Sequence, residues 1–147
     1  MTTFKIFNET LKPSEKEKDV IVNFLHQHLE EYGDEPKDIR KCLDFAIKES
    51  PNSMGGFVLI FTEDDKIKGI TIVNKTGMSG YIPENILVYI AVHNGARGQG
   101  VGKKIMKRAL ELSEGGMALH VEPNNPAKFL YEKLGFENKY LEMRYHK

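Results

Sequence analysis

Residues 86–102 read ILVYIAVHNGARGQGVG, and this stretch decides the fold. Its first seven residues, 86–92, form an apolar run suited to a strand that is covered on both faces. A glycine-rich turn follows, and apolar residues at helical spacing then predict a helix over about residues 100–114. Two glycines end that helix, and residues 117–121 return as a strand. We therefore predict a right-handed βαβ unit.

The flanking sequence predicts further strands and helices. Helical spacing, helix starts and breakers indicate helices over about residues 13–32, 36–49 and 125–134. Apolar and alternating runs predict strands over residues 3–8, 56–61, 67–73 and 140–145, with a small extra strand around Phe136. This order indicates an α/β fold of the mixed α+β kind, with helices on both faces of a mixed sheet.

Composition sets bounds on the class of protein. The 147 residues contain no repeat or long linker, so we expect one domain over residues 1–147. The 21 basic and 21 acidic residues give no net charge, which argues against nucleic acid or an anionic membrane as a partner. The single cysteine, Cys42, excludes a disulfide framework and a multi-cysteine zinc site. No signal peptide or apolar span is evident, so we predict a cytoplasmic protein.

The glycine-rich turn carries the chemical signal. It lies between a buried strand and a helix, where free backbone amides and the helix dipole attract anions. No acidic residue occurs between Glu84 and Glu111, whereas five basic residues do. The spacing is not that of an ATP-binding P-loop, and its late position does not suit a dinucleotide-binding turn. We predict a cradle for a phosphorylated ligand; the alternative is a flexible loop before a solvated basic helix.

Two segments resemble one family. Residues 97–102, RGQGVG, resemble the Arg/Gln-x-x-Gly-x-Gly/Ala signature of the GCN5-related N-acetyltransferases (GNAT). Residues 124–136, NNPAKFLYEKLGF, resemble that family's Asn-x-x-Ala-x-x-Leu-Tyr-x-x-x-Gly-Phe segment. The resemblance implies a GNAT-like sheet of six to seven mostly antiparallel strands with about four helices. It also implies an acetyltransferase that uses acetyl-CoA and no metal.

The resemblance assigns roles by position. Strand residues would present their backbone to the pantetheine arm and the thioester: Ile90, Ala91 and Val92. Turn residues would bind the pyrophosphate: Arg97, Gly98, Gln99, Gly100, Val101, Gly102 and Lys103. Asn124 would contact the arm, with Asn125 as the other choice, and Tyr131 would lie near the sulfur.

The chemistry of acetyl transfer adds further candidates. Backbone N–H of Ala91 or Val92 can stabilise the oxyanion, and Tyr131 can protonate the departing thiolate. A lysine amine is neutral in only about one molecule in 2,500 at pH 7, so such an acceptor needs a base. His120 is the first candidate because imidazole is mostly unprotonated at that pH. Glu84, Glu122 and an ordered water are the others.

Partners and competing functions remain open at this stage. We expect an amine acceptor, either a small molecule or a peptide, and a homodimer is compatible with the sequence. Acidic residues in the segments expected to face the acceptor suit a cationic amine: Glu30, Glu31, Asp34, Glu35 and Glu84. The alternatives are a non-catalytic acyl-CoA sensor and a nucleic-acid-binding domain that uses residues 97–108. The latter lacks an aromatic platform.

Overall fold

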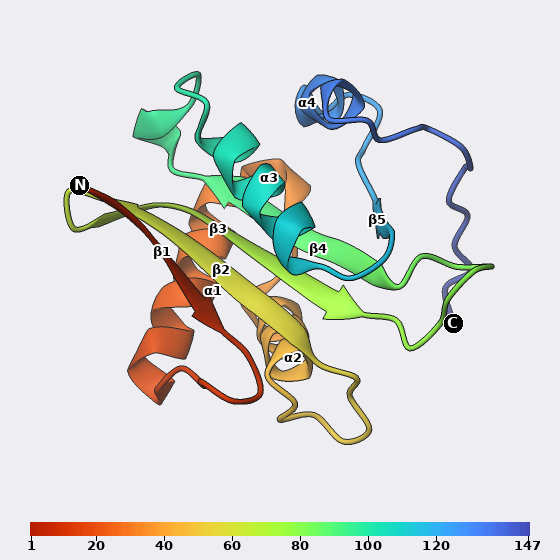
Figure 1. Cartoon of the computed structure of the whole chain (residues 1–147), viewed down its shortest axis with the longest axis horizontal. Coiled ribbons are helices and arrows are strands. Elements are labelled where there is room, and N and C mark those ends of the chain that lie inside the picture. Colours follow the sequence, from red (N-terminus) through yellow and green to blue (C-terminus); the bar gives the residue numbers. More distant parts are fainter.

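The computed structural model describes residues 1–147 and contains one five-stranded sheet with the strand order β1-β2-β3-β4-β5 (Figure 1). The strands are β1 (Thr2–Phe7), β2 (Gly56–Glu63), β3 (Lys66–Lys75), β4 (Asn85–Val92) and β5 (Met117–Leu119). The first four pair antiparallel in chain order. Only β4 and β5 are parallel, because helix α3 crosses over between them.

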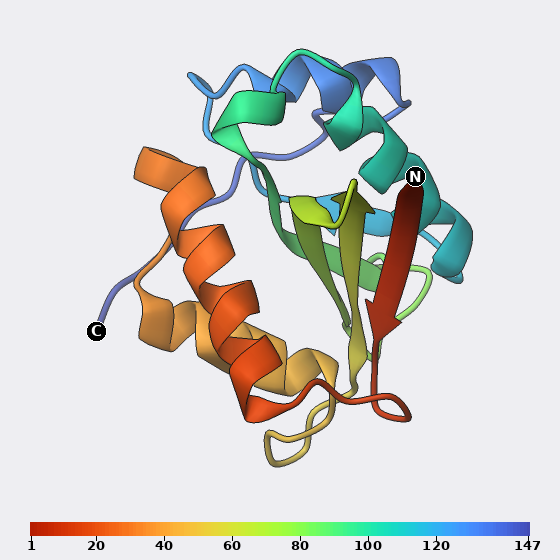
Figure 2. The same cartoon turned by 90° about the vertical axis from the view of Figure 1, so that its left-hand side faces the viewer.

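Four α-helices cover the two faces of the sheet. They are α1 (Glu15–Leu29), α2 (Pro36–Ala46), α3 (Val101–Leu112) and α4 (Ala127–Lys133), with short 3₁₀ turns η1 (Glu30–Tyr32) and η2 (Asn94–Ala96). Figure 2 shows α1 and α2 on one face and α3 on the other. No helix has the length and apolar character that crossing a bilayer requires.

Two apolar clusters occupy the two faces. The first has 14 buried residues and joins α1 and α2 to the sheet, with Leu25 and Leu43 fully buried. The second has 11 buried residues and joins α3 to the other face, with Ile105 fully buried. The three interior strands, β2, β3 and β4, contribute to both clusters. This accounts for the continuous apolar run of β4.

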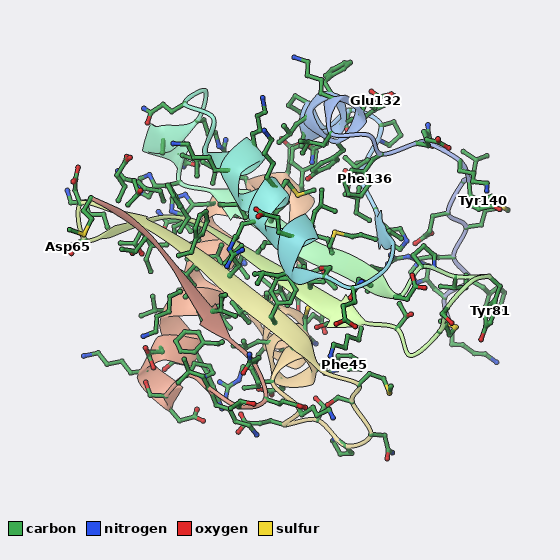
Figure 3. All side chains as sticks on the ribbon, in the orientation of Figure 1. Phe45, Asp65, Tyr81, Glu132, Phe136 and Tyr140 are labelled. Carbon is green, nitrogen blue, oxygen red and sulfur yellow. The ribbon has the colours of Figure 1, made fainter.

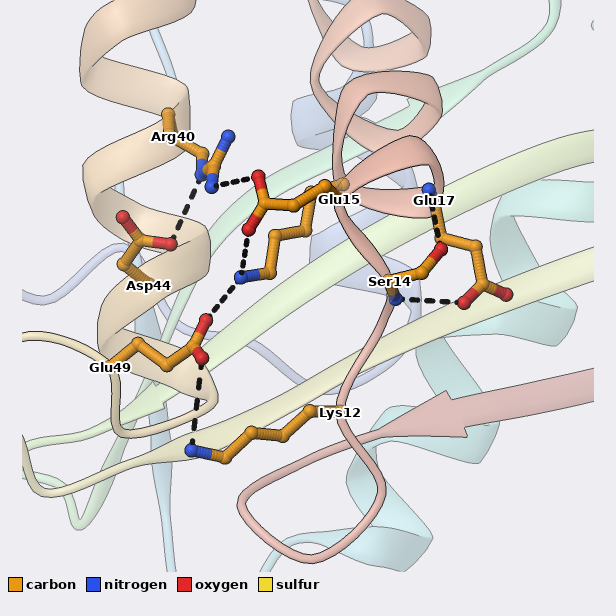
Figure 4. Close-up of polar contacts among 8 residues, drawn as sticks. Lys12, Ser14, Glu15, Glu17, Arg40, Asp44 and Glu49 are labelled. Atoms are coloured by element: carbon orange, nitrogen blue, oxygen red, sulfur yellow. Dashed lines mark hydrogen bonds and ion pairs between the residues drawn. The ribbon is translucent and has the colours of Figure 1, made fainter.

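Local signals fix how α1 begins and packs (Figure 4). The Ser14 hydroxyl accepts from the Glu17 amide, and the Glu17 carboxylate accepts from the Ser14 amide, which is a capping box. Lys18, whose side chain is 6% exposed, pairs with Glu15 and Glu49. Arg40 of α2 pairs with the same Glu15 at 3.1 Å, so these charges join α1 to α2.

The predicted mixed, mostly antiparallel fold is confirmed, but the number of strands is five rather than six to seven. The predicted strand over residues 140–145 is wrong, as is the small strand around Phe136. The C-terminal segment alternates in sequence, yet it pairs with no strand, and Tyr140 is 80% exposed (Figure 3). Alternation alone does not create a strand, because a strand also needs pairing and packing against neighbours, and this segment pairs with none.

Several predicted boundaries also shift. The first helix ends at Leu29 and continues only as the turn η1, and the second ends at Ala46, before Lys48 adopts a left-handed φ of 60°. Strand β5 ends at Leu119 rather than at residue 121. Cys42 packs against the first cluster and accepts a hydrogen bond from Asn74 Nδ2 at 3.4 Å. Burial raises the pKa of that thiol to about 12.

Candidate functional site

The two parallel strands separate after three residue pairs. Asn85–Leu87 of β4 pair with Met117–Leu119 of β5, and no later residue of β4 pairs on that side. The edge of β4 from Val88 to Val92 is therefore open. A cavity of about 440 Å³ lies at this opening, lined by β4, by residues 119–123, by Tyr131 and by the segment after α1.

A bulge reorganises β4 at the point where the strands separate. Ile72 of β3 lies opposite Tyr89 while Val73 lies opposite Leu87, so Val88 is the extra residue. Leu87 and Tyr89 would share a face in a regular strand. Here Leu87 packs in the α3 cluster and Tyr89 packs in the cluster of α1 and α2. The bulge thus directs Tyr89 toward the α1 side of the opening.

Backbone directions in the open part of β4 follow from one hydrogen bond. The His93 amide donates to the Lys68 carbonyl, 2.8 Å away, and so points toward β3. Amide directions alternate along a strand that pairs on one side. The amide of Ala91 therefore also points toward β3, whereas those of Ile90 and Val92 point toward the open edge.

The glycine-rich turn leaves a row of backbone amides without partners. Gly98 and Gly100 have φ values of +79° and +80°, in the left-handed region that favours glycine, and the space beyond both Cα atoms is open. Gly100 precedes α3, and no side chain caps that helix. The amides of residues 98–103 donate no hydrogen bond within the protein. Free amides and the positive end of the helix dipole are groups that can bind an anion.

Three elements meet beside this turn. A Cβ atom on Gly102 would lie 3.3 Å from Leu130 Cδ2 of α4 and 3.7 Å from Val92 Cγ2. The start of α3 therefore lies against the end of β4 and against the helix that carries Tyr131. A ligand with its anionic part on the turn amides can extend along the open edge of β4 into the cavity.

The basic residues near the turn differ in whether they already have a partner in the protein. Arg97 Nη2 donates to the His28 carbonyl at 2.7 Å, and Nη1 pairs with Glu30 Oε1 at 3.1 Å. Both partners lie at the end of α1, so Arg97 fastens the turn to that end. Lys103 and Lys107 form no ion pair and remain as positive charge on the first turns of α3.

Tyr131 faces the cavity from α4. Its side chain is 7% exposed and lines the cavity, and its hydroxyl makes no hydrogen bond with the protein. Burial raises the pKa of Tyr131 to about 12. The phenol therefore stays protonated at neutral pH and can donate a hydrogen bond or a proton into the cavity.

The two neighbouring asparagines have different environments. Asn125 Oδ1 accepts a hydrogen bond from the Ala127 amide at 2.9 Å and so caps the start of α4. The Asn124 carbonyl accepts a long hydrogen bond of 3.4 Å from the Tyr32 hydroxyl. The side chain of Asn124 is exposed and makes no hydrogen bond in the protein, so it is the freer of the two.

The candidate bases lie in two different places. His120 and Glu122 line the same cavity as Tyr131. Glu84 lies before the other end of β4, where Oε1 accepts from the Gly116 amide at 2.8 Å, and this hydrogen bond lowers the pKa of Glu84. The structure thus brings two of the three together with Tyr131. No group of three or more His, Cys, Asp or Glu side chains is arranged to hold a metal ion.

Two residues that complete the cavity wall were not predicted as site residues. Glu142 and Arg144 belong to the C-terminal segment, for which the sequence predicted a strand. The Tyr89 hydroxyl donates to Asp34 Oδ2 at 2.5 Å. This hydrogen bond holds the Asp34 carboxylate in place on the side of the cavity nearest α1. The sequence of β4 does not reveal the bulge, so it cannot show that Tyr89 faces the cavity.

Comparison with known proteins gives one family. A protein-family model described as an acetyltransferase (GNAT) domain matches residues 54–138, more than half of the chain. No curated protein sequence matches the chain.

Solved structures agree in fold. A GNAT family acetyltransferase from Streptococcus pneumoniae has a TM-score of 0.70 at 18% identity and covers 100% of this chain and 98% of its own. An aminoglycoside N-acetyltransferase in complex with CoA has a TM-score of 0.68 at 14% identity, and the match covers 100% of this chain and 96% of that protein. The ribosomal-protein-S18-alanine N-acetyltransferase from Escherichia coli has a TM-score of 0.66 at 15% identity, with 95% and 80% covered. Similarity at these identities establishes a shared fold.

Proposed function

Because the chain belongs to the GNAT acetyltransferase family, we propose that it is an acetyl-CoA-dependent N-acetyltransferase that acetylates a primary amine. The acceptor is a small molecule, a polyamine or a peptide or protein amine. One observation carries the proposal: uncapped amides at the start of α3 adjoin the open edge of β4, and that edge leads to Tyr131.

Acetyl-CoA binding follows from this arrangement. The amides of residues 98–103 and the unpaired Lys103 take the pyrophosphate. The pantetheine arm, which carries amide groups of its own, lies along Ile90–Val92 and uses the hydrogen-bonding groups that β5 leaves free. Asn124 contacts the arm from the other side. Arg97 acts mainly by holding the turn against α1, since its guanidinium is already engaged.

The transfer step requires an oxyanion donor and an acid. The amine nitrogen attacks the thioester carbonyl, the C–N bond forms, and the C–S bond breaks as the thiolate leaves. Of the two amides predicted for the oxyanion, that of Val92 points toward the open edge and that of Ala91 points toward β3. Val92 is therefore the donor that we propose, with Ile90 next along the edge. Tyr131 returns a proton to the thiolate.

A base must remove a proton from the attacking amine. His120 and Glu122 are the candidates that share the cavity with Tyr131. We retain His120 as the first choice, because imidazole is mostly unprotonated at pH 7 and can accept a proton there. Water held by the free carbonyls of β4 is the alternative. Glu84 is the least suitable, because it is engaged with Gly116 at the other end of the strand.

Two measurements test the proposed function. Calorimetric titration with acetyl-CoA, with ATP and NAD as controls, should give saturable binding to acetyl-CoA alone. Free-thiol detection with a panel of primary amines should then show acceptor-dependent release of CoA. An absence of acetyl-CoA binding would contradict the assignment. Binding without thiol release for any amine would instead favour the non-catalytic acyl-CoA sensor.

A further inference from the structure

The open edge of β4 divides the cavity into two sides. Tyr131 belongs to the cluster on the α3 face, whereas Tyr89 belongs to the cluster on the α1 face, yet both line the cavity. In the proposed reaction the thioester lies on the Tyr131 side. The Tyr89 side is then left for a part of the acceptor that does not react.

A carboxylate is held in place on that second side. Asp34 Oδ2 accepts the hydrogen bond from Tyr89, whose side chain is only 8% exposed. The Asp34 carbonyl lies 3.3 Å from His26 Nδ1 of α1, so the backbone is held as well. Burial, followed by the hydrogen bond to Asp34, raises the pKa of Tyr89 well above its usual value. The phenol therefore remains a donor to the carboxylate at all ordinary pH values.

The charges that line the cavity leave this carboxylate without an ion pair, although the pKa of Arg144, raised mainly by its hydrogen bond to Glu142, is raised a little by Asp34 as well. The charged and titratable residues that line the cavity are three carboxylates and two basic residues: Asp34, Glu122, Glu142, Arg144 and His120. Arg144 pairs with Glu142, which His120 also approaches at 3.9 Å. No Lys, Arg or His nitrogen lies within 4.0 Å of the Asp34 carboxylate oxygens. The unpartnered hydroxyl of Tyr131, which is nine-tenths buried, independently marks the same cavity as one built for a ligand.

We propose that Asp34, positioned by Tyr89, binds a second positive charge of the acceptor, and that the acceptor is an amine with another cationic group. This inference rests on the proposed function and specifies its substrate class. A carboxylate beside the reacting nitrogen would favour the ammonium form, which cannot attack. On the far side of β4 it neutralises a remote ammonium without that penalty.

Matched amines test this inference. The probes are diaminoalkanes of two to eight carbons, each compared with the monoamine of the same length. In the wild type we expect kcat/KM for at least one diamine to exceed that of its monoamine about fivefold, a modest factor because Asp34 is exposed to solvent. Asp34→Asn should bring that ratio close to one. Tyr89→Phe, which keeps the carboxylate and loses its support, should give an intermediate ratio.

Asp19→Asn provides the control. Asp19 is an exposed acid of α1 that does not line the cavity, so its loss should leave the ratio at the wild-type value. A wild type without diamine preference at any length would overturn the inference. A preference that survives in Asp34→Asn, or that falls equally in Asp19→Asn, would overturn it too.

A binding measurement separates this inference from the proposed function. Calorimetry of the same diamines and monoamines on protein saturated with CoA needs no turnover. Tighter binding of a diamine that disappears in Asp34→Asn would support the site even if no acetyl transfer occurred. Acetyl transfer to monoamines and diamines at equal efficiency would support the proposed function and refute the role of Asp34.

Discussion

The chain divides at the end of α3 into two regions that are built differently. Residues 1–112 hold four of the five strands and nearly all of the buried side chains. In residues 113–147, Tyr131 is the only buried residue, and the last strand has three residues. Figure 1 shows this second region as α4, the short β5 and an extended segment that runs to the C-terminus.

The difference indicates which part of the molecule supports the fold and which part receives the ligand. Two packed clusters and the charge network between α1 and α2 stabilise the first region. The second region contributes half-buried side chains and most of the wall opposite β4. Regions with little buried apolar area open at low free-energy cost, and a ligand that binds across them stabilises them. We therefore expect acetyl-CoA to order residues 113–147 more than residues 1–112.

Paired truncations should give the largest contrast. Leu43 is fully buried between α2 and the sheet, whereas Leu119 of β5 is half-buried. Leu43→Ala should lower the free energy of unfolding by about 3 kcal/mol, and Leu119→Ala by about 1 kcal/mol. Urea denaturation of both variants measures this. Equal losses would show that the two regions share one core after all.

Tyr131→Phe tests the one buried residue of the second region, which is also the residue that we propose as the acid. Removing the hydroxyl should lower turnover about 100-fold, because the leaving thiolate loses its proton donor, and should leave acetyl-CoA affinity within about twofold. Tyr140→Phe, at an exposed hydroxyl in the same region, is the control. Steady-state kinetics with calorimetry separates the two effects. Equal losses in turnover and affinity would argue against the acid role.

The sequence predicted the first region better than the second, for a physical reason. Helices α1 and α2 show the period that burial on one face enforces, whereas strands such as β2 and β3 are continuous apolar runs because both faces are covered, so these positions were evident. Residues 140–145 alternate like a strand but pair with no other strand. The alternation in the sequence cannot show whether a partner strand is available. The glycine-rich turn was predicted because its chemistry depends on glycines that lie within a few residues of one another in sequence, at 98, 100 and 102.

The acceptor side could not be predicted in the same way. Its features depend on the Val88 bulge, which adds one residue to β4 and reverses the side-chain order beyond it. Nothing in the apolar run of β4 marks the position of that extra residue. Asp34 was noted only as one of several acids, and its contact with Tyr89 joins residues 55 positions apart.

Gly100→Ala tests whether the turn serves the ligand rather than the fold. Gly100 and Gly80 have nearly the same φ, +80° and +78°, and open space beyond the Cα atom. Alanine at either position should cost about 1 kcal/mol of stability, because both require the left-handed conformation. Only Gly100→Ala should also weaken acetyl-CoA binding, about tenfold, by placing a methyl group at the turn amides. Equal acetyl-CoA affinities in the two variants would contradict the pyrophosphate assignment.

The smallest expected effect concerns acid stability, and it belongs to the first region. The hydrogen bond from Lys18 lowers the pKa of Glu49 and of Glu15. A carboxyl whose pKa is lower in the folded state contributes stability above its ordinary pKa and loses it as pH falls through the lowered value. Lys18, with a raised pKa, loses its contribution only in strongly alkaline solution.

Urea midpoints measured from pH 7 to pH 3 should therefore fall less steeply in Glu49→Gln than in the wild type. The control is Glu132→Gln on α4, where the side chain lies at the surface and forms no ion pair (Figure 3). Its acid profile should match that of the wild type, because Glu132 forms no ion pair that acid could break. If Glu132→Gln flattened the profile as much as Glu49→Gln, acid stability would not reside in the charges that join α1 to α2. The contrast between the two regions would then rest on apolar packing alone.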